Sequence, residues 1–227
     1  MYKFNKVIIL LFLVIFSTSS YAHIEHYTIL NRIEFDIYRN KKLIGKHVFT
    51  FKRFEKKLEV ESEINFQIKK LGVTLYKYHV KGTETYNGSK LIKFNSKTDQ
   101  NGKQKYVNLK AENDELIIDG SSFKGKVPNE YLLGTWWNHS IVKAKAQISA
   151  VSGRIIKQNV KFLGKEVIKI GDKTYKTLHF NFSSSDNKLD KDKKLNTDVW
   201  YEEESLNWVK ASFNKKGKWE YKLISLD

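Results

Sequence analysis

The chain has 227 residues with 41 Lys or Arg against 25 Asp or Glu, which gives a formal net charge of +16. It has no cysteine, so disulfides, thiol chemistry and thiolate metal sites are excluded. The positive charge is mostly lysine spread along the whole chain, whereas nucleic-acid sites usually gather arginine into one patch. We therefore expect no nucleic-acid partner. The favoured interpretation is that the lysines form the solvated face and protect strand edges. The weaker alternative is affinity for anionic lipid or polyanionic envelope polymers, which a field of this sign favours.

The first 22 residues have the order of a secretory signal peptide. Lys3 and Lys6 precede an apolar core, and small residues end the segment at Ala22. The apolar core is shorter than the roughly 20 residues that a membrane-spanning helix needs. The sequence therefore predicts cleavage after Ala22, export to the periplasm, and a single antiparallel β domain over residues 23–227 with no transmembrane span.

From the start of this domain, runs of strand length are separated by turn signals. Between Lys57 and Lys69 apolar and charged residues alternate, and one face is formed by Leu58, Val60, Ser62, Ile64, Phe66 and Ile68. This period of two is typical of a strand with one buried face. Asn87-Gly88 and Asn101-Gly102 are strong hairpin signals, because both residue types tolerate positive φ. The strands predicted in this half are 29–38, 43–54, 58–68, 73–86, 90–98, 103–111 and 116–119.

The alternation breaks at Pro128, the only proline in the chain. We expect a short helical turn after this proline, because proline suits a first helical position. Residues 128–139 then cross from one half of the sheet to the other. Strands resume with a turn expected at Gly164-Lys165, and they are predicted at 141–150, 154–163, 166–170, 175–183, 196–201, 207–214 and 218–226.

About a dozen short strands without an amphipathic helix predict an all-β fold in which sequential strands pair. A sheet with so many strands does not stay flat, because strand twist makes it curl. The candidates are a strongly curved antiparallel sheet and an open or closed up-and-down β-barrel. Trp219, Tyr221 and Leu223 in the last strand are expected to face the same core as the first strands.

Several segments resemble an uncharacterised family of exported bacterial proteins, domain of unknown function 6134. They run in order over most of the domain: residues 40–49, 76–79, Glu84 with Tyr86, 99–102, Trp137-Asn138, Trp200-Tyr201, and Gly217 followed by Tyr221. The resemblance implies an exported, all-β, single-domain protein. It implies no activity, cofactor or catalytic residue.

Glu84 and His79 are the weak catalytic candidates. Glu84 shares a face with tyrosines that we expect to be buried, and a buried carboxylate needs a partner or a proton. The favoured interpretation is a structural acid paired with tyrosine hydroxyls or a lysine, and the alternative is a base with a raised pKa. His79 falls on the opposite face, so the two meet only if a bulge intervenes, for which Gly82 is suited. A hydrolase or isomerase using Glu84 and a histidine is therefore the weaker alternative.

His23 and His26 would lie at the new N-terminus, where an amine and imidazoles can chelate copper. No third ligand follows at a recognisable spacing, and the first residues of a domain usually fray. The sequence also lacks a phosphate-binding loop and a nucleophile elbow. We therefore expect no metal site and no cofactor.

Aromatic residues make up 14% of the chain. Ordinary core packing is the favoured explanation of such clusters. Trp136, Trp137, Tyr76, Tyr78 and His47 are nevertheless the candidate contacts for an apolar or amphipathic ligand, for example one derived from lipid, inside the curved sheet or barrel. Non-enzymatic ligand binding is the first hypothesis. The alternative is an envelope structural or assembly protein that binds a protein partner through a sheet face or edge.

Overall fold

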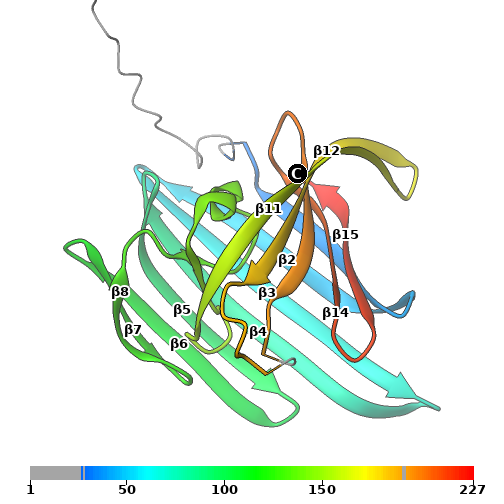
Figure 1. The fold of residues 1–227 in the computed structure, drawn as a ribbon, viewed down its shortest axis with the longest axis horizontal. Helices are drawn as coiled ribbons and strands as arrows, with labels where there is room; N and C mark the ends of the chain where they lie inside the picture. The colour runs from blue at the N-terminus through cyan, green and yellow to red at the C-terminus, as the bar shows by residue number, and fades with distance from the viewer. Residues whose placement is uncertain (1–26, 28, 191–192) are drawn as a thin grey trace, which may run out of the picture.

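The computed structural model describes residues 27, 29–190 and 193–227 (Figure 1). The predicted signal peptide and His23 and His26 lie outside the described residues. The strands are β1 (Arg32–Arg39), β2 (Lys42–Phe54), β3 (Lys57–Lys70), β4 (Val73–Asn87), β5 (Lys90–Gln100), β6 (Lys103–Glu112), β7 (Glu115–Gly120), β8 (Lys124–Pro128), β9 (Leu132–Leu133), β10 (Ala146–Ile148), β11 (Ile155–Ile170), β12 (Lys173–Ser184), β13 (Asn196–Glu202), β14 (Trp208–Asn214) and β15 (Lys218–Leu226), with a 3-10 helix, η2, at His139–Lys143.

All of these strands form one 15-stranded sheet in the order β8 to β1, then β15 to β9. Almost every neighbour in the sheet is also a neighbour in sequence, and only the β9–β10 pair is parallel. The all-β prediction is therefore confirmed. β8 and β9, consecutive in the chain, lie at opposite edges of the sheet, so residues 129–131 connect its two edges, as the crossing predicted after Pro128 requires.

The two faces of the sheet follow the alternation in the sequence. On β3 the predicted inner residues are buried or half-buried, while the residues between them are half-buried or exposed.

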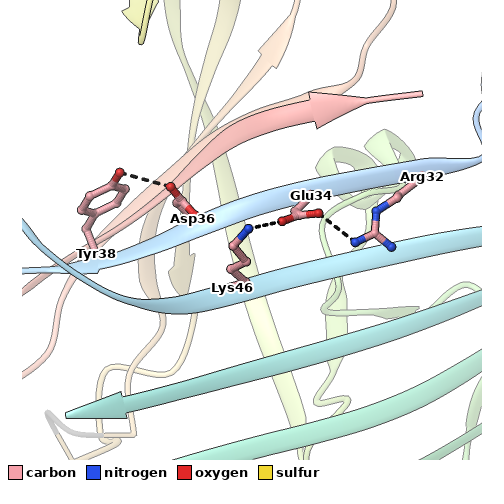
Figure 2. Close-up of polar contacts among 5 residues, drawn as sticks. All are labelled: Arg32, Glu34, Asp36, Tyr38 and Lys46. Atoms are coloured by element: carbon pink, nitrogen blue, oxygen red, sulfur yellow. Dashed lines mark hydrogen bonds and ion pairs between the residues drawn. The ribbon is translucent and has the colours of Figure 1, made fainter. Parts of the chain in front are cut away.

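On the outer face of β1, Arg32 Nη2 lies 2.8 Å from Glu34 Oε2, and Lys46 of β2 also pairs with Glu34 (Figure 2). Tyr38 donates a hydrogen bond of 3.3 Å to Asp36 (Figure 2). The hydrogen bonds from Lys46 and Arg32 lower the pKa of the Glu34 carboxyl.

Two apolar clusters fill the concave side of the sheet. The larger one joins the inner residues of β1–β3 to those of β13–β15, and it includes Tyr221 and Leu223 as predicted. The smaller one joins β5–β8 to Leu133 of β9 and Ile148 of β10. Ser122 and Ser96 make hydrogen bonds to the backbone of the segment after β10, and these tie that edge of the sheet to its other half. The later strands therefore lie across the earlier ones (Figure 1).

Three local predictions are wrong. Gly164-Lys165 is not a turn, because β11 runs unbroken past it with a register shift between Phe162 and Gly164. At Gly164, φ is +137, so the glycine forms a bulge within the strand. The strand predicted at 141–150 is reduced to β10, because residues 139–143 form η2 instead. The segment directly after Pro128 is a turn rather than a helix.

The described residues include no helix with the length and apolar character needed to span a membrane.

Candidate functional site

His47 lies on the inner face of β2 among aromatic rings. Its ring centroid is 4.2 Å from that of Phe49 and 5.9 Å from that of Trp208. Nε2 lies 3.0 Å from the Ser62 hydroxyl oxygen on β3, while Nδ1 has no hydrogen-bond partner among the described residues. Burial lowers the pKa of His47 to about 3. The imidazole is therefore neutral at physiological pH and keeps one ring nitrogen for another partner.

A cavity of about 180 Å³ begins at this histidine. Its walls come from β2 to β5 on one side and from residues 134–136 and 147–151 on the other. They include His47, Ser62, Phe94 and Trp136, and none of the lining residues carries a charged side chain. The cavity is therefore suited to a small neutral molecule with an apolar body.

Trp136 is held in the cavity wall by an unusual backbone conformation. Its φ is +61, in the left-handed region that bulky residues rarely adopt. The hydroxyl of Tyr201 donates to its carbonyl oxygen at 3.0 Å, and its ring packs edge-on to Trp208 at 5.6 Å. Nε1 is buried without a hydrogen-bond partner among the described residues. Strained residues of this kind often lie at functional sites.

Glu84 is fully buried next to this cavity and does not line it. It accepts a hydrogen bond of 2.5 Å from the Tyr86 hydroxyl and one of 3.0 Å from Trp137 Nε1. Burial raises the pKa of Glu84, and the hydrogen bonds from Tyr86, Trp137 and Thr135 oppose this increase. The tyrosine hydroxyl is the partner expected for a structural acid.

The structure does not bring Glu84 and His79 together. The pairing of β3 with β4 stays regular from His79 to Glu84, so the two side chains keep to opposite faces. His79 Nε2 lies 2.7 Å from Glu63 on the outer face. Gly82 does not form the bulge that would join them, because the two register shifts on this strand lie elsewhere, between Thr74 and Tyr76 in the pairing with β3 and between Thr85 and Tyr86 in the pairing with β5.

The other predicted ligand contacts lie away from the cavity wall. Trp137 is fully buried in the larger cluster, where it packs edge-on against Tyr27 and Phe51. Tyr76 and Tyr78 stack on Phe66 at the other end of β4. Within the part of the chain that the structure describes, no group of three His, Cys, Asp or Glu side chains is arranged to hold a metal ion.

Ser62 and Trp208 belong to the site but are not among the residues predicted from the sequence. Ser62 has a signal, because it is the one polar residue in the inner-face series of β3. The sequence contains no such signal for Trp208, because its contacts with His47 and Trp136 join segments that are far apart in the chain. Gln147 and Thr135 reach the cavity in the same way.

Comparison with known proteins assigns a family and a fold. Among solved structures, the crystal structure of a beta-barrel-like protein of domain of unknown function DUF1849 from Brucella abortus is similar to the chain, with a TM-score of 0.60. The two sequences are 10% identical, and the likeness covers 87% of this chain and 97% of that chain, so it shows the fold alone. A search of the curated proteins found no match. Residues 35–224 match the family described as domain of unknown function 6134. This match spans most of the chain and confirms the resemblance, so the protein belongs to the DUF6134 family.

Proposed function

We propose that the protein is an exported, periplasmic, non-enzymatic binding protein that holds a small neutral amphipathic ligand in the cavity between His47 and Trp136. One observation carries the proposal. His47 Nδ1 and Trp136 Nε1 are both buried without a partner among the described residues, and both side chains line the same cavity. Buried polar atoms are almost always hydrogen-bonded, so two such atoms at one cavity indicate a ligand with a polar atom.

The dimensions and chemistry of the cavity narrow the class of ligand. Its volume of about 180 Å³ is close to that of apolar cavities of roughly 150 Å³ that bind benzene. Trp136 Nε1 is a donor only, so it requires an acceptor such as a hydroxyl, ester or carbonyl oxygen. A neutral His47 and an uncharged wall disfavour a carboxylate. A single ring or a short alkyl chain with one oxygen fits these conditions.

Benzyl alcohol and ethylbenzene test the proposal, because they have similar size and differ in the hydroxyl group. We expect benzyl alcohol to bind more tightly, to change tryptophan fluorescence and to raise the melting temperature. Trp136→Phe keeps a ring but removes this donor, so the preference for the alcohol should fall to what His47 Nδ1 alone supports. Trp219→Phe, on β15 and outside the cavity wall, is the matched control.

A second experiment examines the protein as cells make it. Native mass spectrometry after gentle purification should detect a small retained mass, which Ala150→Leu should displace by filling the cavity. The proposal is overturned if the protein is empty and neither probe binds.

One observation favours the alternative of a protein partner. β11 pairs with β10 only up to Lys157 and continues to Ile170, and no other described strand pairs with this edge. Phe162 and Val167 are exposed along it. A free strand edge with apolar residues is a template for strand addition by another chain. If a protein partner binds this edge, cross-linking from Val167→Cys in cells should give one discrete adduct. The absence of any adduct would contradict the partner hypothesis.

A further inference from the structure

The hairpin of β3 and β4 ends in exposed apolar side chains. Leu71 is 95% exposed, Val73 62% and Leu75 55%. Leu71 lies in the turn between β3 and β4, and Val73 and Leu75 lie at the start of β4. Single exposed apolar residues are common, but three in five positions at one projecting end are typical of a contact surface.

Unpaired cations surround these residues. Lys41 lies in the adjoining turn between β1 and β2, Lys42 begins β2, and Lys69 and Lys70 end β3. Among the described residues none of these four lysines has an acidic side chain within ion-pair distance, whereas Arg32 and Lys46 on the outer face are both paired with Glu34 (Figure 2). Residues 37–54 and 64–83 contain no Asp or Glu. We call this surface, residues 39–43 and 69–75, the basic tip.

A groove of about 700 Å³ opens at the basic tip, between the residues around the β1–β2 turn and the last residues of β3. Its walls combine the cations Arg39, Lys42 and Lys69 with the apolar side chains Leu43 and Phe66. The Arg39 guanidinium is fixed there, because it donates to the Lys216 carbonyl and lies over the ring of Trp219, 5.8 Å from its centroid. Such a wall has partners for both a phosphate group and an acyl chain.

We propose that the basic tip docks on an anionic lipid bilayer. Leu71, Val73 and Leu75 enter the interface between head groups and acyl chains, while Arg39, Lys42 and Lys69 bind lipid phosphates. Charge complementarity favours an anionic membrane as the partner. Lysines without ion-pair partners flank the exposed apolar side chains, as in other interfacial anchors. The surface is independent of the cavity at His47, which shares none of the groove's lining residues.

The absence of cysteine permits a test on the full chain with one label at a time. Leu71→Cys with an environment-sensitive fluorophore reports whether the tip enters lipid. Val167→Cys is the matched control, because Val167 is 67% exposed and lies on β11, away from the tip. With vesicles of phosphatidylglycerol and phosphatidylcholine we expect a blue shift at position 71 only. With phosphatidylcholine alone we expect none.

Charge variants separate the local surface from the net charge of the protein. Lys42→Glu, Lys69→Glu and Lys70→Glu together should lower vesicle affinity at least about 100-fold, since each cation near an anionic membrane contributes about a factor of five. Lys161→Glu, Lys169→Glu and Lys173→Glu change the net charge equally at exposed positions elsewhere and should have a much smaller effect. Both triple variants should melt at the temperature of the original protein, because none of these lysines makes an ion pair in the described structure.

Three results would overturn the proposal. Equal fluorescence shifts at positions 71 and 167 would show that the protein binds the vesicle through another part of the chain, such as the N-terminal segment. Equal binding to neutral and anionic vesicles would remove the role of the lysines. A shift at position 71 with soluble polyglutamate but not with vesicles would assign the surface to an acidic polymer.

Discussion

At the level of single residues, His47 makes the stability of the fold depend on pH. Its folded pKa of about 3 lies below the unfolded value of 6.5, so the unfolded chain takes up a proton that the folded chain excludes. The stability that neutral His47 contributes is complete above pH 6.5 and is lost as pH falls toward 3. We expect a slope of roughly 1.4 kcal/mol per pH unit in that window.

His47→Gln tests this dependence. Glutamine can still reach Ser62 but binds no proton, so the difference in unfolding free energy between the variant and the original protein should shift in the variant's favour at each step from pH 7 to pH 4. Urea denaturation at each pH measures it. Phe51→Leu, also buried on β2 but packed on Trp137 rather than on His47, should cost the same at every pH. A constant difference for His47→Gln would contradict the prediction.

Glu84 has the opposite dependence. Burial raises its folded pKa above 4.5, so the folded state holds the proton more tightly, and stability is lost as pH rises through the folded pKa. Glu84→Gln has no proton to release, and its stability relative to the original protein should improve between pH 4 and pH 8. Glu84→Ala should cost about 1–3 kcal/mol or more at both, because Tyr86 and Trp137 lose a buried partner. Thermal unfolding of both variants and of the original protein at pH 4 and pH 8 measures these differences.

At the level of elements, Gly45 sets how closely β2 approaches β3. A Cβ atom on Gly45 would lie 2.1 Å from the Asn65 carbonyl oxygen and 2.4 Å from Phe66 Cβ, so the two strands would have to separate. Gly45→Ala should destabilise the fold by about 3 kcal/mol or more, at the upper end of overpacking effects. Gly88→Ala is the control, because its Cβ would meet open space and only its φ of +55 is unfavourable, which costs about 1 kcal/mol. Urea denaturation of both variants gives the comparison, and equal costs would contradict the argument.

The elements differ in how far the sequence predicts them. The hairpins at Asn87-Gly88 and Asn101-Gly102 and the alternation of β3 are local signals, and all three are confirmed. Gly164 shows the limit, since a glycine suits both a turn and a bulge, and only the pairing of β11 with β12 separates them.

The candidate site is less accessible to prediction for the same reason. His47 can be placed on an inner face from period alone, but its neighbours in space come from other strands. The hydrogen bond of Trp137 to Glu84 joins residues 53 positions apart, and the positive φ of Trp136 has no signal in its own residue type. The shape of the cavity therefore depends on contacts that no local pattern encodes.

At the level of the whole molecule, β15 joins the two ends of the chain into one sheet. It pairs with β1 on one side and β14 on the other, and Tyr221 and Leu223 face Ile37 and Phe35 across the β1 pairing. Without β15 the larger cluster would lose these two side chains, and the sheet would have two unpaired edges at its centre. Because this pairing links distant parts of the sequence, it requires the complete chain.

We therefore expect a chain that ends at Asn214 to lack a cooperative thermal transition and to bind dyes that recognise exposed apolar surface. A synthetic peptide of residues 215–227 should restore the transition by adding the missing strand in trans, because the backbone of β1 and β14 and the apolar core offer it a prepared position. The same peptide with serine in place of Tyr221 and Leu223 keeps the backbone donors but loses the apolar contacts, and it should restore nothing. Near-ultraviolet circular dichroism and tryptophan fluorescence follow the result. If the shortened chain melts like the complete one, β15 does not hold the two halves of the sheet together.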